Sequence, residues 1–168
     1  SAAGVPAPAG PEGTSSAAAP GVRGVLSALN LSDGTLRWQA PLSGFEATGG
    51  AVVQDGTAYV STPPSAYDVA TGTLRWQAAP TTLLGRALGG PALDAAHATV
   101  FVGLADSLSN TGAVAALDAA SGRLRWQTPL GVELPRGTER LWVDGDTVLV
   151  PNFSGAVIGL DAQSGQER

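Results

Sequence analysis

Cysteine, methionine and lysine are all absent from this chain of 168 residues, which has a single histidine. Without cysteine there is no disulfide, no thiolate metal ligand and no cysteine nucleophile, so thiols give no indication of the redox compartment. The nine basic residues are all arginine, and with 14 acidic residues they leave a net charge of −5. Surfaces that bind nucleic acid depend on clustered basic residues, so nucleic acid is not expected as a partner.

Long hydrophobic runs are also missing, and no apolar segment has the roughly 20 residues of a membrane-spanning helix. Any membrane association is therefore expected only through an anchor that this sequence lacks. A content of 43% hydrophobic and 14% charged residues is nevertheless typical of a globular protein. The exception is the start of the chain, where Ala, Gly, Pro and Ser dominate, so residues 1–21 are predicted to be a disordered linker before a folded domain at 22–168.

A repeated phrase ending in Leu-Arg-Trp-Gln organises the folded part of the chain. It occurs three times in full, and Trp38, Trp76 and Trp126 are 38 and 50 residues apart. This period is the size of one β-propeller blade, which consists of four short antiparallel strands. The pattern predicts an all-β fold with about three and a half blades, which form part of a ring of about six to eight.

Turn dipeptides divide the chain into these blades. Asp-Gly, Thr-Gly or Ser-Gly occupies the same place in each copy, where glycine allows the positive φ of a tight hairpin, and the glycines are Gly34, Gly72, Gly122 and Gly165. The predicted units are a strand pair at 22–39 and blades at about 49–77, 90–127 and 139–168. Because the ring is incomplete, self-association through open strand edges is expected.

Strict alternation within the Leu-Arg-Trp segment places Leu74 and Trp76 on one face of the strand and Arg75 on the other. The indoles are thereby predicted to wedge between neighbouring blades.

The repeat Ala-x-Asp-x-x-x-Gly-x-x-x-Trp resembles the tryptophan-docking repeat of the PQQ-like (pyrroloquinoline quinone-like) β-propeller superfamily. It is met in full from Ala66 and from Ala116, whereas Asn30 replaces the Asp in the first copy. The last copy has Gly159 for the Ala and stops one residue short of the expected Trp. The resemblance implies that the Trp stacks between blades and that the Asp braces the turn, roles that fall on Trp38, Trp76, Trp126, Asp68, Asp118 and Asp161.

Proteins with this repeat are of several kinds. Quinoprotein dehydrogenases hold PQQ and calcium on the propeller axis beside a vicinal cysteine pair, scaffolds similar to the propeller lipoprotein of the outer-membrane barrel assembly machine bind proteins, and quinoprotein-type sensor domains are tethered to bacterial kinases. The absence of cysteine favours a non-catalytic scaffold or sensor that binds a partner protein and needs no cofactor. The alternative is a fragment of a PQQ- and calcium-dependent dehydrogenase. The resemblance further implies a bacterial protein in the periplasm, the cell envelope or the extracellular space.

The candidate partner site lies in long loops that are expected to share one face of the propeller, since binding residues usually occur on loops of a rigid scaffold. These loops combine arginines with apolar groups, as interface hot spots do. The candidate residues are Arg86, Arg136, Arg140, Phe45, Leu83, Leu84 and Leu134. The alternative is that the leucines pack under their own loops while the arginines remain solvated.

Three other features have a structural and a functional interpretation. Trp142, outside the repeat, is expected in the innermost strand of its blade, where it could stack on a planar ligand or pack against the next blade. His97 lacks a second imidazole and is interpreted as an exposed turn residue. Asp144 and Asp146 are too close in sequence to supply the six to eight oxygens of a calcium site, so they are assigned to a hairpin turn. The sequence thus predicts no catalytic residue and no metal ligand.

Overall fold

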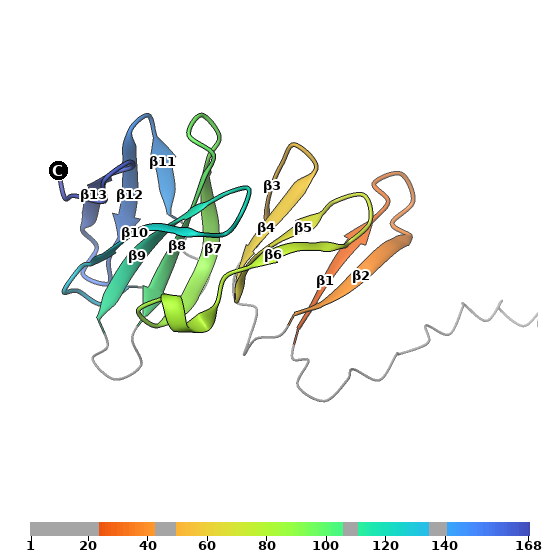
Figure 1. Ribbon diagram of the computed structural model, residues 1–168, viewed down its shortest axis with the longest axis horizontal. Helices are drawn as coiled ribbons and strands as arrows, with labels where there is room; N and C mark the ends of the chain where they lie inside the picture. Colours follow the sequence, from red (N-terminus) through yellow and green to blue (C-terminus); the bar gives the residue numbers. More distant parts are fainter. Residues whose placement is uncertain (1–23, 43–49, 106–110, 135–140) are drawn as a thin grey trace, which may run out of the picture.

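Four antiparallel β-sheets stand side by side in the computed structural model of this protein (Figure 1). The structure describes residues 24–42, 50–105, 111–134 and 141–168. In chain order the sheets have two, four, four and three strands, and we call them blades 1 to 4. The prediction of an all-β fold that forms part of a propeller is confirmed. Within the described ranges, no helix is long and apolar enough to cross a membrane.

The strands of each blade follow one another in space in the order of the chain. Blade 1 is the hairpin of β1 (Gly24–Leu29) and β2 (Leu36–Leu42). Blade 2 contains β3 (Val52–Gln54), β4 (Thr57–Ser61), β5 (Pro64–Asp68) and β6 (Leu74–Gln77). Blade 3, which follows the 3-10 turn η1 (Pro80–Thr82), contains β7 (Arg86–Asp94), β8 (Thr99–Ala105), β9 (Gly112–Asp118) and β10 (Leu124–Pro129). Blade 4 contains β11 (Trp142–Asp144), β12 (Thr147–Pro151) and β13 (Val157–Asp161).

The connections between strands form two opposite faces of the molecule (Figure 1). The hairpin face carries the tight turns, such as those between β3 and β4, β7 and β8, and β11 and β12. The opposite face, which we call the long-loop face, carries the link from β6 to β7 and the turns between β4 and β5 and between β12 and β13. Three strands extend beyond the bounds that the sequence pattern suggested. β2 continues to Leu42, β10 continues to Pro129 and β7 begins at Arg86.

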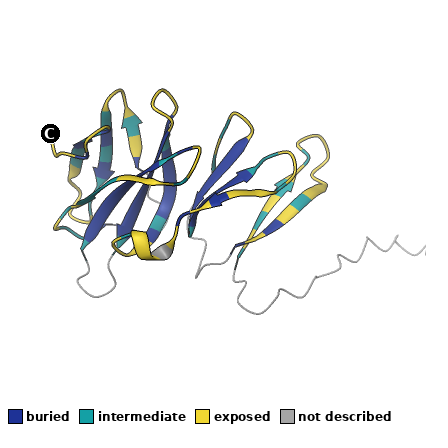
Figure 2. Ribbon diagram, in the orientation of Figure 1, coloured by how far each residue is buried: buried dark blue, intermediate teal, exposed yellow. Residues whose placement is uncertain are grey.

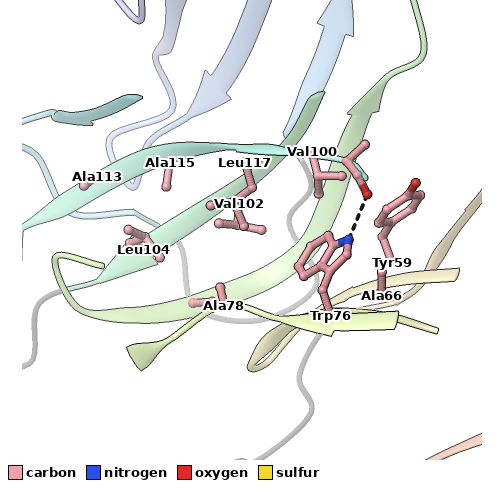
Figure 3. Packing of buried hydrophobic residues seen from close by; sticks show 12 residues of the cluster. Tyr59, Ala66, Trp76, Ala78, Val100, Val102, Leu104, Ala113, Ala115 and Leu117 are labelled. Atoms are coloured by element: carbon pink, nitrogen blue, oxygen red, sulfur yellow. Dashed lines mark hydrogen bonds between the residues drawn. The ribbon is translucent and has the colours of Figure 1, made fainter. Parts of the chain in front are cut away.

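Apolar side chains fill the spaces between neighbouring blades. Buried residues concentrate in the middle strands of blades 2 and 3, β4, β5, β8 and β9 (Figure 2). Between blades 2 and 3, Tyr59 and Trp76 pack with Val100, Val102 and Leu104 (Figure 3). Successive residues of a strand point to opposite faces, so the interior blades contribute to two cores each.

The same alternation builds the two other cores. Phe101 and Val114 of blade 3 face blade 4, where Val148 and Val150 belong to the same cluster. The cluster between blades 1 and 2 is smaller and includes Ala40, Leu42, Val60 and Tyr67.

A β-bulge in the outermost strand corrects the alternation predicted for the Leu-Arg-Trp segment. Trp76 pairs with Ala66, but Leu74 pairs with Tyr67, so Arg75 is the extra residue of the bulge. Since Ala66 and Tyr67 point to opposite faces, Leu74 and Trp76 also lie on opposite faces, contrary to the prediction. The same register shift occurs next to Trp38 and Trp126.

Candidate functional site

The outer turn of every blade has the same backbone geometry. Its glycine has a left-handed φ, with values of 73°, 73°, 70° and 73° at Gly34, Gly72, Gly122 and Gly165. The N–H of each glycine donates to the carbonyl oxygen four residues earlier, at 2.8 Å in all four turns.

This turn receives the indole of the preceding blade. Trp76 Nε1 donates to the carbonyl oxygen of Ala119 at 2.8 Å (Figure 3). Its ring lies so close to the turn that a Cβ on Gly122 would be 2.4 Å from Trp76 Cε3. We call this arrangement of a carbonyl acceptor and a glycine surface an indole dock. Because any side chain at the glycine would collide with the ring, glycine is required there for close approach as well as for φ.

The indole dock occurs at all three joints between blades. Trp38 Nε1 donates to the oxygen of Val69 at 2.8 Å and its ring lies against Gly72. Trp126 donates to the oxygen of Ala162 at 3.1 Å and lies against Gly165. The strand partner of each indole is alanine, which leaves room for the ring, and the pairs are Ala28 with Trp38, Ala66 with Trp76 and Ala116 with Trp126.

An aspartate braces each of the last three turns. In blade 3, one oxygen of Asp118 accepts from the N–H of Ser121 at 2.9 Å and from its hydroxyl at 2.7 Å. The other oxygen accepts from Arg125 at 2.7 Å, and this guanidinium also donates to the Thr99 hydroxyl at 2.6 Å.

Equivalent ion pairs join Asp68 to Arg75 in blade 2 and Asp161 to Arg168 in blade 4. Each arginine again donates to a threonine at the start of the second strand, Thr57 or Thr147. Sequence reasoning did not find this network, although an arginine follows the aspartate by seven residues in each of these copies.

The hydrogen bonds of these turns lower the pKa values of their aspartates. Bonds from Arg75 and Thr71 lower the pKa of Asp68 to about 2. Bonds from the Ser121 hydroxyl and from Arg125 lower the pKa of Asp118 to about 2. The pKa of Asp161 is held well below its usual range by the Ser164 amide and by Arg168.

We expect the protein to lose stability as the pH falls below about 4. The folded pKa of Asp68 and of Asp118 is about 2 and lies below the unfolded value, so this stabilisation is fully present above pH ~4 and is lost as the pH falls through about 2. Urea unfolding between pH 6 and pH 2 tests this in the wild type and in the double variant Asp68→Asn, Asp118→Asn. The variant should be less stable at pH 6 and should show a shallower loss in acid. Identical slopes for the two proteins would contradict the assignment.

The structure describes four of the seven candidate partner residues. Phe45, Arg136 and Arg140 lie outside the described residues. Arg86 is exposed at the beginning of β7, and Leu83 is half-buried against the core between blades 2 and 3.

Leu84 is 53% exposed on the long-loop face. Its N–H donates to Oε1 of Gln127 at 2.9 Å, which fixes its backbone to blade 3. A hollow of about 300 Å³ beside it is lined by Leu84, Gly85, Thr111, Gly112, Ala113 and Pro129.

Leu134 does not belong to an exposed partner surface, which corrects the sequence prediction. It is buried in the cluster between blades 3 and 4, and a Cβ on Gly112 would lie 2.2 Å from its Cγ. Its segment is held to blade 3 by the bond from the N–H of Gly112 to the oxygen of Val132 at 2.7 Å. The side chain therefore anchors its loop, as the alternative interpretation stated.

The turn between β12 and β13 presents Phe153, which sequence reasoning missed. This aromatic side chain is 69% exposed. The turn is rigid because Oδ1 of Asn152 accepts from the N–H of Ser154 at 3.0 Å and from the N–H of Ala156 at 2.9 Å. The sequence signal was the segment Pro-Asn-Phe-Ser-Gly, in which Asn, Ser and Gly favour a turn around Phe153.

Trp142 is exposed and lies on the side of blade 4 that points away from blade 3. It pairs with Leu149, whose neighbours Val148 and Val150 are buried toward blade 3. Ligand stacking and packing against a further blade both stay predictions for this indole.

His97 lies in an exposed turn, where its Nδ1 is 2.7 Å from Oδ2 of Asp94. In the part of the chain that the structure describes, no three His, Cys, Asp or Glu side chains converge on a common metal position.

These features define a class of protein: a partial β-propeller whose consecutive blades are joined by indole docks. The sequence profile of the family described as outer membrane protein assembly factor BamB matches residues 22–168. The chain belongs to this family of PQQ-like propeller repeats, which confirms the resemblance found in the sequence.

Solved structures agree with this assignment. BamB from Moraxella catarrhalis is 25% identical with a TM-score of 0.67, and the match covers 86% of this chain and 42% of that chain. Quinohemoprotein alcohol dehydrogenase from Comamonas testosteroni is 27% identical with a TM-score of 0.53, over 73% of this chain and 21% of that chain. The computationally designed Ika4 protein shares the fold at 17% identity and a TM-score of 0.62, over 82% and 79% of the two chains. No protein with a curated description matches the chain.

Proposed function

We propose that this chain is a non-catalytic propeller scaffold or sensor module that binds a partner protein through its long-loop face. The observation that supports this most directly is Phe153, an exposed aromatic side chain presented by a rigid turn on that face. Aromatic residues in such positions dominate the binding energy of many protein interfaces. An ordered turn also reduces the entropy lost on binding.

The two faces of the molecule differ in what they offer a partner. On the hairpin face, the carboxylates and guanidinium groups of the outer turns bond to one another. On the long-loop face, Leu84 and Phe153 are exposed, Arg86 adds a cationic group, and the hollow beside Leu84 could take an apolar side chain. This combination suits an extended peptide or loop with apolar and acidic residues.

The relatives bear on the cellular location and on the alternative function. The chain spans less than half of the BamB structure and about a fifth of the dehydrogenase that it matches. The family description names a factor for assembly of outer membrane proteins, and we extend it to an extracytoplasmic location for this chain. Among the described residues no contact favours the dehydrogenase alternative. Dye-linked alcohol oxidation after addition of PQQ and Ca²⁺ would nevertheless overturn a non-catalytic role.

We expect Phe153→Ala and Arg86→Glu each to weaken binding to a partner by about tenfold or more, because each removes a hot-spot group from the long-loop face. The partner would be captured from an envelope extract of the source bacterium, purified and measured by calorimetry. The free energy of unfolding should change by no more than about 0.5 kcal/mol, as for most surface substitutions.

The matched controls lie away from the long-loop face. Leu74→Ser alters a side chain that is 47% exposed beside the outer turn of blade 2, and Asp55→Arg reverses a charge on the hairpin face. Both controls should bind the partner as the wild type does. Loss of binding in the controls alone would place the site on the hairpin face and refute the proposal.

A further inference from the structure

A polar hollow lies on the hairpin face, between blades 3 and 4. Its volume is about 330 Å³, and its lining consists of His97, Thr99, Arg125, Ala162 and Gln163. We call it the His97 hollow. Small-molecule sites in proteins begin at about this size, so the hollow has room for one small ring.

The turn that carries His97 is longer than its counterparts in the neighbouring blades. Residues 95–98 separate the paired strand residues Asp94 and Thr99, whereas only residues 55–56 and 145–146 occupy this place in blades 2 and 4. The longer turn brings an imidazole beside the outer turn of blade 4. Because His97 is the only histidine of the chain, no other joint between blades has such a group.

Asp94 determines which ring nitrogen of His97 is available to a ligand. Nδ1 of His97 lies 2.7 Å from Oδ2 of Asp94, and Asp94 is only 6% exposed. A carboxylate oxygen accepts hydrogen bonds, so Nδ1 carries the proton and donates it. Nε2 of the neutral ring then keeps its lone pair, and it has no hydrogen-bond partner among the described residues. The hollow therefore contains one free acceptor whose orientation is fixed.

Arg125 and Gln163 add hydrogen-bond donors to the same hollow. The guanidinium of Arg125 donates to the His97 carbonyl at 2.8 Å, to the Thr99 hydroxyl at 2.6 Å and to Asp118 at 2.7 Å. Since a guanidinium has five N–H groups, two of them remain available. The side-chain amide of Gln163 also makes no hydrogen bond to the described residues, although its backbone N–H donates to Asp161.

The charges that line the hollow are already compensated. Arg125 forms an ion pair with Asp118, and a protonated His97 has Asp94 as its partner. An anion would thus gain no net attraction, and it would face the lone pair of Nε2. A hydroxyl group suits the lining better, because it can donate to Nε2 and accept from a guanidinium N–H.

We propose that the His97 hollow binds a neutral polyol with the chemistry of vicinal hydroxyl groups on a sugar ring. One hydroxyl donates to Nε2 of His97, and a second accepts from Arg125. The amide of Gln163 can donate to either hydroxyl or accept from it. The ring can belong to a free monosaccharide or to the end of a glycan. This inference does not depend on the proposed function of the long-loop face.

The single histidine provides the reporter for a test on the full chain. The probes are D-glucose, D-galactose and D-mannose, added at pH 8.5, above the range in which imidazole usually titrates. We expect at least one sugar to cause a saturable shift of the Nε2 resonance in the ¹⁵N NMR spectrum of His97, with a smaller shift of Nδ1. The methyl glycoside of that sugar distinguishes the two sources. Equal binding indicates a glycan end, and loss of binding indicates a free monosaccharide.

Two arginine variants separate binding from the structural role of the outer turns. Arg125→Gln should weaken binding of the sugar by about tenfold or more, since a charge-assisted hydrogen bond is lost. Arg75→Gln is the matched control, because Arg75 makes the equivalent bonds to Asp68 and Thr57 but has no histidine beside it. The control should lose similar stability and bind as the wild type does. If Arg125→Gln fails to fold, the exposed Gln163→Ala replaces it, with a loss of about threefold expected.

Three results would overturn the proposal. The first is the absence of a shift at Nε2 with all three sugars at high millimolar concentration. The second is an equal loss of sugar binding in Arg125→Gln and Arg75→Gln. The third is acetate that binds at pH 8.5 more tightly than every sugar, which would assign the hollow to anions.

Discussion

Replacement of Trp76 by alanine is expected to lower the free energy of unfolding by about 3–5 kcal/mol, the usual cost of truncating a buried large aromatic. Trp76 is 9% exposed, and its ring centroid lies 6.1 Å from that of Tyr59. Its N–H donates to the Ala119 carbonyl at 2.8 Å. The substitution therefore opens a cavity between blades 2 and 3 and removes the hydrogen bond that joins them.

The other tryptophans provide the comparison. Trp126→Ala should also be strongly destabilising, because Trp126 packs on Phe101 with a centroid distance of 5.7 Å and donates to Ala162. Trp142→Ala should cost about 1 kcal/mol or less, since this indole is exposed. Denaturant unfolding of the three variants measures these differences. Equal losses at all three positions would show that the indole docks do not hold the blades together.

The second large effect is expected at the glycine that receives Trp76. Gly122→Ala should destabilise the protein by about 2–5 kcal/mol, of which about 1–2 kcal/mol comes from the left-handed backbone and the rest from overpacking. The added Cβ would lie 2.4 Å from Cε3 of Trp76, so the indole must leave its position.

Gly56→Ala isolates the backbone contribution, because its φ is 71° but its Cβ would meet no described atom within 4 Å. We expect this control to cost only about 1–2 kcal/mol. The difference between the two variants, measured by urea unfolding, is the contribution of the indole contact. If the two losses are equal, the close approach of Trp76 to Gly122 has no energetic importance.

The parts of the fold that depend on local chemistry could be predicted from the sequence. A left-handed turn conformation strongly favours glycine, so Gly34 and its counterparts indicated the outer hairpins from the sequence alone. The spacing of Trp38, Trp76 and Trp126 likewise indicated the size of a blade. Both signals repeat, and repetition distinguishes them from chance.

Other features depend on contacts that no local pattern encodes. The alternating pattern predicted that Leu74 and Trp76 lie on the same face of the strand. This was wrong because Arg75 forms a bulge, and nothing in the sequence distinguishes Arg75 from an ordinary strand residue. Leu134 resembled an exposed loop leucine, but the space above Gly112 that receives it forms only when the segment folds back on blade 3. Phe153 escaped notice for the opposite reason, since an aromatic residue is normally assigned to a core.

The location of each indole dock also bears on how such chains change during evolution. Every joint uses the tryptophan of one repeat and the turn of the next, and the described joints involve no third repeat. A duplicated gene segment that encodes one blade would thus bring both halves of a joint with it, and its neighbours would need no compensating substitutions. The number of blades can accordingly change by one complete blade at a time. The loops can diverge independently, because they take no part in the joints between blades.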